Sequence, residues 1–432
     1  MMPMQEKLKT LINSLLEGKS FEENLDALFL ERLRGQVQVN YPTILVTGTN
    51  GKGSVCAFIS SILKSSGYRV GVFTSPHVID YNERVTIDNV NIPDQDFYDY
   101  LQKVANDTAY LDRPFGFFRL LTLVAHSYFL DQKIDIAVIE VGIGGAKDIT
   151  NYFNPEISII TKVALDHCEV LGDNREKIGL EKAKIFRSSQ PAIYGEFDIP
   201  NSVLDYAQKI NTNLLRFGID FTAKINDRNS WHYLDLKNNF NNLYSLLTPS
   251  MRGEQQVVNA AIAVCAIQQL ECVSNRFNFS KTVIKNAISM TRLKGRFEVL
   301  PGYPRVILDV AHNPDAVANM VHNMLELGLK NNIAVFAVAK DKDIKNIIKN
   351  SKKYFKKWYI SPIENIDRSC NLEDIVQELT QQDVLLDDIC SFDCVADAML
   401  AALKMRQADY NIVVFGSFLT VAAASQVEFR KI

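Results

Sequence analysis

Residues 43–67, TILVTGTNGKGSVCAFISSILKSSG, join a short apolar strand, a glycine-rich turn and a helical pattern. In the turn, glycines let backbone N–H groups point toward an anion, Lys52 supplies a positive charge, and the helix N-terminus adds its dipole. Ser54 offers a hydroxyl to Mg²⁺. The stretch therefore predicts a phosphate-binding loop made of Gly48, Thr49, Asn50, Gly51, Lys52, Gly53 and Ser54.

The spacing departs from the common GxxxxGK[ST] loop because Gly53 separates Lys52 from Ser54. The alternative is an ordinary glycine-rich turn between a strand and a helix, with an incidental lysine. The helix is well marked, since apolar residues recur at helical spacing from Val55 and Gly67 predicts a left-handed end. Strand, turn and helix in direct succession favour the phosphate loop.

Similar apolar, β-branched runs alternate with helical patterns along the chain, which predicts an α/β fold with mostly parallel sheets covered on both faces. The expected strands are 43–47, 68–73, 134–141, 157–163, 305–310, 333–338 and 411–415. The polar segment 198–251 predicts a peripheral β-rich excursion or long loops. We place a boundary between two α/β blocks at residue 295, and we assign helix 256–270 to the first block.

Length and composition exclude several classes of protein. A chain of 432 residues is too long for one hydrophobic core, so two or three domains are expected. A net charge of −3 argues against binding to nucleic acid or to an anionic membrane. Seven cysteines without a CxxC pair argue against a disulfide framework or a zinc site. No signal peptide is evident and no apolar run approaches the ~18 residues of a membrane span, so we expect a cytoplasmic protein.

Further motifs follow the loop in a fixed order. They are TSPH (74–77), NERV (82–85), VIEVGIGG (138–145), ALDH (164–167), EKA (181–183), GRFE (295–298), DVAHNP (309–314), DKD (341–343) and GSF (416–418). Together with GTNGKGS at 48–54, they resemble the folylpolyglutamate synthase/dihydrofolate synthase branch of the Mur ligase superfamily. Each motif is weak alone, but their order over residues 43–425 is specific.

The resemblance implies two domains. Residues 1–295 would form an ATP-binding, P-loop, Mur-ligase-like central domain, and residues 296–432 a Rossmann-like glutamate-ligase domain that closes over the nucleotide. It implies an ATP-dependent, ADP-forming acid–amino-acid ligase of folate biosynthesis and one-carbon metabolism. L-Glutamate would be joined through an acyl-phosphate to dihydropteroate, to the γ-carboxyl of a tetrahydrofolate, or to both. The partners would be these small molecules, ATP and Mg²⁺, and we expect a monomer.

Two magnesium sites are expected. Glu140 ends an apolar strand, where a buried carboxylate is costly unless it is paired or bound to metal. By resemblance, Glu140 and Ser54 hold one Mg²⁺ and His167 a second. Without the resemblance, a salt-bridged glutamate and a structural histidine are the alternatives.

Lys182 shares a predicted helix face with Ile178 and Phe186. Desolvation favours its neutral amine, which can add CO₂ and become a carbamate ligand, as the resemblance implies. The alternative is a lysine whose ammonium reaches water from the edge of the apolar stripe.

The remaining site residues rest on the resemblance. The catalytic residues would be Lys52, Lys182 and His312. Asn259 and Arg296 would contact phosphates, Asp309 the ribose or adenine, and His312 and Ser417 the acyl-phosphate and glutamate. The pterin would contact Pro76, His77, Arg84, Phe118 and Asp148, through aromatic stacking and a carboxylate that accepts ring N–H donors.

The sequence also departs from this branch around the acid substrate, at Arg119, Ala146, Ile149, Gln255 and residues 337–339. These departures leave open which acid is activated. Two other functions remain open: a P-loop kinase or NTPase, and a folate-binding relative that has lost turnover.

Overall fold

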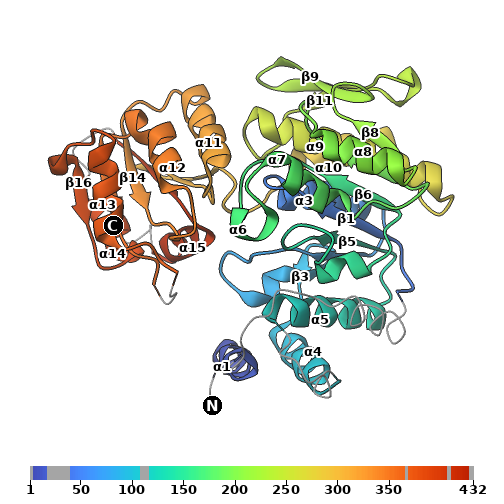
Figure 1. Cartoon of the computed structure of the whole chain (residues 1–432), viewed down its shortest axis with the longest axis horizontal. Helices are drawn as coiled ribbons and strands as arrows, with labels where there is room; N and C mark the ends of the chain where they lie inside the picture. The colour runs from blue at the N-terminus through green and yellow to red at the C-terminus, as the bar shows by residue number, and fades with distance from the viewer. Residues whose placement is uncertain (1–2, 17–38, 108–115, 365–367, 406–409, 428–432) are drawn as a thin grey trace. The chain divides into compact units, whose positions relative to one another are not determined.

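The computed structural model describes residues 3–16, 39–107, 116–364, 368–405 and 410–427. The chain forms two compact units. The first contains Met1–Pro249 and Val257–Thr291, and the second contains Ser250–Gln256 and Arg292–Ile432. Each unit is an α/β structure built on its own sheet (Figure 1).

The first unit is built on an eight-stranded sheet with the order β4-β3-β2-β5-β1-β6-β7-β8. Its pairs are parallel except β2–β3 and β3–β4, which are antiparallel. The strands are β1 (Thr43–Thr47), β2 (Val70–Phe73), β3 (Val85–Ile87), β4 (Val90–Asn91), β5 (Ile136–Glu140), β6 (Ile157–Ile160), β7 (Pro191–Tyr194) and β8 (Asn213–Arg216). The predicted mostly parallel α/β class is confirmed; the short strands β3, β4, β7 and β8 were not predicted.

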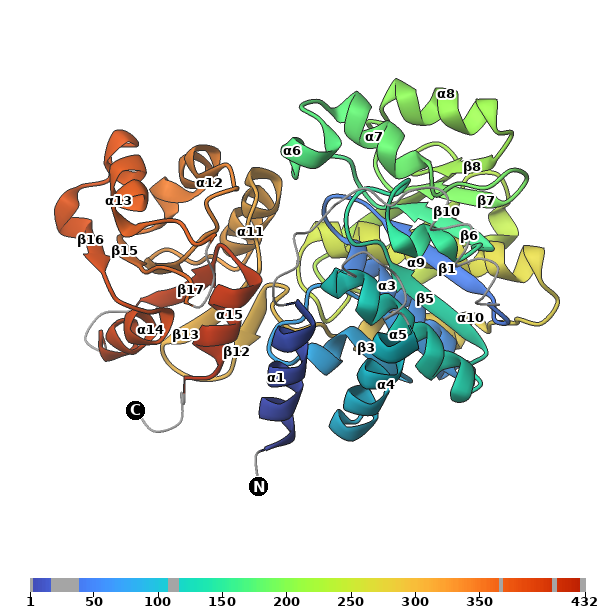
Figure 2. The same cartoon turned by 60° about the horizontal axis from the view of Figure 1, so that its bottom comes forward.

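Helices cover both faces of this sheet, as continuous apolar strands require. The helices described in the first unit are α1 (Met4–Leu16), α3 (Lys52–Ser65), α4 (Asp94–Asp107), α5 (Phe117–Asp131), α6 (Cys168–Leu171), α7 (Arg175–Ala183), α8 (Asn201–Lys209), α9 (Glu254–Val273) and α10 (Lys281–Met290). Helices α4 and α5 pack together on one face, and α3 packs against α10 and β5 (Figures 1 and 2).

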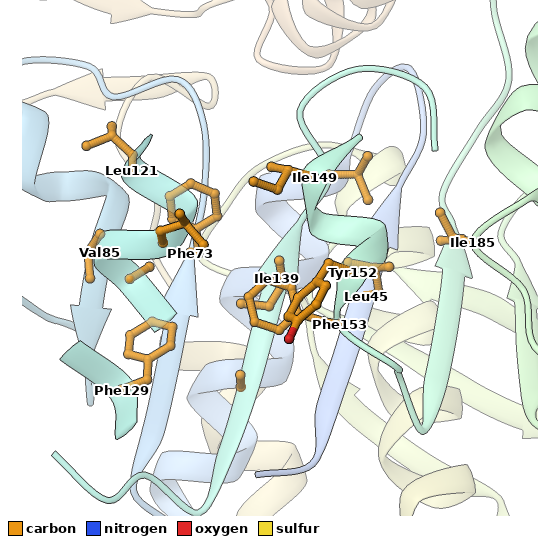
Figure 3. Packing of buried hydrophobic residues seen from close by; sticks show 14 of the residues in the cluster. Leu45, Phe73, Val85, Leu121, Phe129, Ile139, Ile149, Tyr152, Phe153 and Ile185 are labelled. Atoms are coloured by element: carbon orange, nitrogen blue, oxygen red, sulfur yellow. The ribbon is translucent and has the colours of Figure 1, made fainter. Parts of the chain in front are cut away.

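Side chains that alternate along each strand divide the core between the two faces. Leu45 and Ile139 belong to the cluster of the α5 face, where they lie with Phe129 and Phe153 (Figure 3). Ile44 and Val46 are equally buried but lie outside that cluster, as period-two alternation requires. The sheet is therefore buried on both sides, and ligands reach it at its ends.

The polar segment after residue 198 is only partly as predicted. It contains a three-stranded antiparallel sheet of β9 (Phe221–Asp227), β10 (Ser230–Asp235) and β11 (Leu243–Leu247), which is the expected β-rich excursion. It also contains α8, which was not predicted, although Val203 and Ala207 lie four residues apart and are both buried. Polar residues surround this short apolar stripe, so the sequence pattern did not indicate a helix here.

The second unit holds a six-stranded sheet with the order β12-β13-β17-β14-β15-β16, parallel except for β12–β13. Its strands are β12 (Glu298–Leu300), β13 (Arg305–Leu308), β14 (Asn332–Phe336), β15 (Lys357–Ile360), β16 (Ile389–Ser391) and β17 (Asn411–Phe415). Its helices are α11 (Pro314–Glu326), α12 (Ile344–Ser351), α13 (Leu372–Gln381), α14 (Val395–Lys404) and α15 (Phe418–Ser425).

Helix α9 is, within the described ranges, the one helix long and apolar enough to cross a membrane by length and composition. This differs from the expectation that no apolar run approaches that length. Of its apolar window, 67% is buried inside the protein. Its hydrophobic residues therefore pack in the core of this structure.

His126 on α5 is a buried titratable group with a single described hydrogen bond. Its Nδ1 lies 2.7 Å from the Tyr41 hydroxyl, and its ring is 5.7 Å from that of Phe153. Burial lowers the pKa of His126 from 6.5 to about 4. The folded protein therefore keeps this ring neutral under conditions in which the unfolded chain would protonate it.

We predict that His126 destabilises the fold as pH falls from about 6.5 toward 4, because only the unfolded chain then takes up the proton. The contribution between pH 7.5 and pH 5 is about 2 kcal/mol. Urea unfolding at both pH values measures it. His126→Gln, which keeps an acceptor for the tyrosine, should show a correspondingly smaller loss at pH 5; an equal loss in both proteins would contradict the prediction.

Candidate active site

The glycine-rich loop joins the end of β1 to the start of α3. Gly51 is the N-cap of α3 and has φ +89°, a left-handed conformation that favours glycine. The Lys52 ammonium folds back onto the loop and donates to the carbonyls of Gly48 at 3.0 Å and Thr49 at 3.3 Å. Ser54 follows in the first turn of α3 and is buried. The loop thus presents a helix N-terminus and a lysine at the edge of the sheet.

Asn259 of α9 lies directly against this loop. It is 1% exposed, and a Cβ built on Gly51 would meet its Oδ1 at 2.8 Å. Position 51 therefore excludes a larger residue for two reasons, its backbone conformation and the close approach of Asn259.

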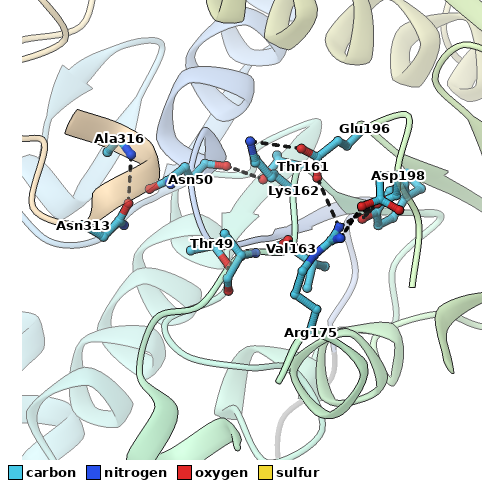
Figure 4. A network of polar contacts seen from close by, with 12 residues as sticks. Thr49, Asn50, Thr161, Lys162, Val163, Arg175, Glu196, Asp198, Asn313 and Ala316 are labelled. Atoms are coloured by element: carbon cyan, nitrogen blue, oxygen red, sulfur yellow. Dashed lines mark hydrogen bonds and ion pairs between the residues drawn. The ribbon is translucent and has the colours of Figure 1, made fainter. Parts of the chain in front are cut away.

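The segment after β6 holds the loop from the other side. The Thr49 amide donates to the Lys162 carbonyl at 2.8 Å, and the Thr161 hydroxyl donates to the Asn50 carbonyl at 2.6 Å (Figure 4). The Thr49 hydroxyl lies 3.0 Å from both the amide and the carbonyl of Ala164. Loop and segment therefore form one rigid edge.

Glu140 is the last residue of β5, beside β1 in the sheet, and it is 3% exposed. Its Oε2 accepts from the Ser75 amide at 3.1 Å. Burial raises the pKa of the Cys56 thiol in α3, and Glu140 raises it further while Lys52 lowers it. The charges of Glu140 and Lys52 therefore both affect Cys56, so the two side chains lie near the same part of α3.

Lys182 lies in the last turn of α7 and is 4% exposed. Its pKa is lowered to about 7, first by burial and then by the charge of Lys52, while Asp166, Asp148 and Glu181 act in the opposite direction. Two lysines and three carboxylates thus lie close enough for their charges to affect Lys182; Lys182 and Asp148 are buried, and Lys52, Asp166 and Glu181 are half-buried.

The predicted helical stretch around Lys182 was too long at its end. Helix α7 stops at Ala183, so Phe186 does not share a helix face with Lys182, although both are buried. Ile178 does lie on the same helix and is buried. The lysine is therefore enclosed by the packing of α7 and not by a stripe that continues to Phe186.

His167 follows β6 and caps the short helix α6, with φ +51°. Its amide donates to Asp166 Oδ1 at 3.0 Å. The charge of Asp166 also raises the pKa of Lys182, so this carboxylate lies near the end of α7. Asp166 was predicted only as part of the motif ALDH; its acidic side chain next to the predicted ligand His167 is the signal that indicates its role.

The segment after β2 carries three predicted substrate residues: Pro76, which follows a cis peptide bond, His77 and Arg84. Arg84 Nε donates to His77 Nδ1 at 2.9 Å, and its guanidinium lies 5.2 Å from the Phe117 ring centroid. Burial, followed by the charge of Arg84, lowers the pKa of His77 to about 4. His77 is therefore a neutral acceptor near pH 7, and Phe117 is a contact that sequence reasoning missed.

Arg84 also connects this segment to Glu140. Burial lowers the pKa of Arg84 to about 10, while Tyr81 and Glu140 act to raise it. The arginine therefore provides a positive charge close to the carboxylate predicted to bind metal.

Phe118 and Asp148 lie beside Gly142, where a Cβ would meet the Phe118 ring at 2.8 Å and Asp148 Oδ2 at 3.0 Å. Asp148 accepts from the Ile143 amide at 3.0 Å and from the Thr150 amide at 2.9 Å. Burial raises its pKa against these hydrogen bonds. The Asp148 carboxylate therefore holds the backbone of its own loop through these hydrogen bonds, besides its predicted role in binding a ligand.

In the second unit, three predicted residues lie around Phe418. The Arg296 guanidinium lies 5.2 Å from the Phe418 ring centroid, and the His312 ring lies 6.0 Å from it. Ser417 precedes Phe418 and caps α15, its hydroxyl accepting from the Leu419 amide at 3.0 Å. Phe418 is an organising residue that sequence reasoning named only within a motif.

Asp309 and His312 have defined protonation properties. Burial raises the pKa of Asp309 to about 6, opposed by the Arg296 charge. His312 Nδ1 lies 2.8 Å from the Val310 carbonyl, which can only accept, so Nδ1 carries a proton. In the neutral form of the ring, the lone pair therefore lies on Nε2.

The first unit thus brings the loop, Asn259, Glu140, Arg84 and Lys182 to the same edge of its sheet. The Ser54 hydroxyl and the Glu140 carboxylate are both buried and lie near Lys52. Their oxygen atoms are of the kind that a hard divalent cation prefers as ligands. Its loop fits a phosphate chain, which helix N-termini and lysines bind.

Comparisons with known proteins agree with this geometry. Residues 117–267 match the Mur ligase middle domain, and residues 295–418 match the Mur ligase, glutamate ligase domain. The dihydrofolate synthase/folylpolyglutamate synthase of Escherichia coli K12 is 34% identical over 427 residues, covering 98% of this chain and 95% of the relative.

Two solved structures are also similar. E. coli FolC in complex with DHPP and ADP has a TM-score of 0.86 and 32% identity, covering 98% of this chain and 97% of the other. A bifunctional folylpolyglutamate synthase/dihydrofolate synthase with Mn, AMPPNP and L-glutamate bound has a TM-score of 0.84 and 30% identity, with the same coverage. The chain belongs to the dihydrofolate synthase/folylpolyglutamate synthase family of Mur ligases.

Proposed function

We propose that this ligase uses ATP to join L-glutamate to dihydropteroate, to the γ-carboxyl of a tetrahydrofolate, or to both. One observation carries the proposal: Lys52, Lys182 and Glu140 converge with the phosphate loop at the edge of the first sheet. Such an arrangement suits phosphoryl transfer to a carboxylate, which depends on positioning and charge neutralisation. The relatives bind ADP, AMPPNP, DHPP and L-glutamate, which supports the choice of substrates.

In the first step, a carboxylate oxygen of the acid attacks the γ-phosphorus of ATP. The new O–P bond forms as the bond to the bridging oxygen breaks, giving an acyl-phosphate and ADP. Lys52 and the N-terminus of α3 hold the phosphates, and Asn259 supports the loop. Magnesium held by Ser54 and Glu140, with His167 and Lys182 at a second site, would neutralise phosphate charge.

In the second step, the amine of glutamate attacks the acyl carbon. The C–N bond forms, the bond to the phosphate oxygen breaks, and the amine loses a proton. We assign Arg296 to phosphate and Asp309 to the nucleoside. His312, with its lone pair on Nε2, and Ser417 are assigned to glutamate and the acyl-phosphate.

We assign the pterin to His77, Arg84, Phe118 and Asp148, with Pro76 shaping the loop. The neutral His77 and the buried carboxylate of Asp148 can accept N–H donors, and Phe118 offers an aromatic face. Arg119 lies near Asp148. Burial lowers the pKa of Arg119, and the charge of Asp148 raises it. This departure from the family pattern therefore adds positive charge to the same region. We also propose that the protein acts in the cytoplasm as a monomer; every cysteine is a free thiol.

The central test is ADP release measured with dihydropteroate or with tetrahydrofolate, each with and without L-glutamate. We expect release to require both the acid and glutamate, because the amine completes the reaction. Glutamate-independent release would favour a kinase or NTPase, and folate binding without any ADP would favour a relative that has lost turnover. Comparison of the two acids separates the two synthase activities.

The close approach at Gly51 predicts a selective effect of a single methyl group. Gly51→Ala should weaken ADP binding by at least about tenfold, because its Cβ meets Asn259 at 2.8 Å and displaces the loop. Gly67→Ala is the matched control, with φ +90° against +89° and nothing within 4 Å of the added Cβ. Both variants carry the backbone strain of about 1–2 kcal/mol. Equal ADP affinities, measured by calorimetry, would contradict the prediction.

We propose that Lys182 is carbamylated. Its neutral amine would add to the carbon of CO₂, forming an N–C bond and releasing one proton, and the carboxylate would bind metal. Its 4% exposure and its place at the end of α7 beside Asp166 support the proposal. We expect Lys182→Ala to abolish activity without rescue by added CO₂.

Carbon-13 NMR with labelled bicarbonate distinguishes the carbamate from a simple ammonium role. A carbamate signal is expected in the unmodified protein and should be lost in Lys182→Ala. Full activity of the variant would refute any essential role of Lys182. Absence of the signal from active protein would refute the carbamate alone.

A further inference from the structure

Arg175, the first residue of α7, lies outside the residues assigned so far and connects three segments. Its Nε donates to the Val163 carbonyl at 2.9 Å, after β6, and its Nη2 donates to the Asp198 carbonyl at 2.7 Å, after β7 (Figure 4). Its Nη1 also pairs with the Asp198 carboxylate, and Nη2 lies 3.7 Å from Glu196 Oε2. One planar guanidinium therefore holds the start of α7 against the ends of two neighbouring strands.

The segment that Arg175 holds is also the segment that holds the phosphate loop. Successive carbonyls of an extended chain point in opposite directions. The Lys162 carbonyl accordingly accepts from the Thr49 amide, while the next carbonyl, that of Val163, accepts from Arg175. The segment is fixed between the loop on one side and the arginine on the other.

The same network extends through Glu196. Its Oε1 lies 3.0 Å from the Lys162 ammonium, and its Oε2 faces Arg175 (Figure 4). The side chain of Lys162 is thereby tied to the loop after β7 while its carbonyl is tied to Thr49. Backbone and side-chain contacts restrain the segment at two successive residues.

Two residues assigned to the second metal site lie on the pieces that Arg175 joins. His167 is in the segment after β6, and Lys182 is on α7, two turns or about 10 Å beyond Arg175. A small shift of α7 relative to this segment would move Lys182 relative to Asp166, whose charge acts on it, and to the next residue, His167. The contacts of Arg175 at the start of α7 therefore help to set the distance between those groups, together with the hydrogen bond from the Ala146 amide to the Glu181 carbonyl at 3.3 Å near its end.

We propose that Arg175 is a positioning residue of the ligase. It fixes the position of α7 relative to the segment of residues 161–167, so that the phosphate loop, His167 and Lys182 lie near one another. This inference rests on the proposed function, and it assigns Arg175 no contact with substrate. Its side chain is 35% exposed and that of Asp198 78%, so the ion pair itself contributes little. The positioning of α7 depends instead on the planar guanidinium, which donates to two backbone carbonyls at once.

The test is Arg175→Lys, which keeps the charge but cannot donate to both carbonyls. The probe is a fluorescent N-methylanthraniloyl ADP, titrated at increasing MgCl₂. We expect the Mg²⁺ concentration needed for tight binding to rise by about tenfold or more, as is usual when groups supporting metal ligands are lost. The kcat should fall by a similar factor, with the KM values for the folate acid and L-glutamate unchanged.

Lys177→Ala is the matched control, because Lys177 lies on the same helix. In the part of the chain that the structure describes, its one ion pair is with Asp173, and both side chains of that pair are exposed. It should bind the probe like the unmodified protein. If Arg175→Lys does the same, or loses thermal stability without a change in Mg²⁺ dependence, Arg175 is merely structural and the proposal is overturned.

If Arg175→Lys does not fold, Arg175→Gln takes its place, since its amide can still donate to one carbonyl. The same shift in Mg²⁺ dependence is then expected, and its absence overturns the proposal. Nucleotide binding is measured without glutamate or a folate acid. Failure of glutamate-dependent ADP release in the unmodified protein would therefore refute the proposed function separately.

Discussion

Parallel pairing of β1 with β5 and β6 is the constraint on which the candidate site depends. It brings three chain segments, each arriving from a different part of the sequence, to one carboxyl edge. The phosphate loop leaves β1, Glu140 ends β5, and the segment with Asp166 and His167 follows β6. Hydrogen bonds between the loop and residues 161–164 then convert this edge into a rigid frame.

Several charged groups lie close together in this frame, and Glu140, Asp148 and Lys182 among them are buried. Burial is the main cause that lowers the pKa of Lys182, and the charge of Lys52 lowers it further, while Asp166 and Asp148 oppose both effects. Such a cluster is costly without compensating ligands. The phosphates and cations that the relatives bind would provide that compensation, which explains why these groups are gathered here and not dispersed on the surface.

Much of the site could be anticipated because its chemistry lies in short motifs next to recognisable strands. Gly51, Lys52 and Ser54 occupy a turn between a strand and a helix, and Glu140 ends an apolar run. Their placement follows from secondary structure alone. Phe418, Phe117 and Arg175 were harder to predict. Their roles come from contacts with residues distant in sequence, which no local pattern records.

Taken by itself, the sequence determined the α/β class, the glycine-rich turn between a strand and a helix, and the family, since strand periodicity, glycine placement and motif order are local properties. Tertiary structure alone decided which charges meet. Helix α7 ends at Ala183, and Lys182 is buried by packing around that end, beside Asp166 from another segment. Electrostatic coupling and burial depend on distances in space, and these are set only when the strands pair and the helices pack against them.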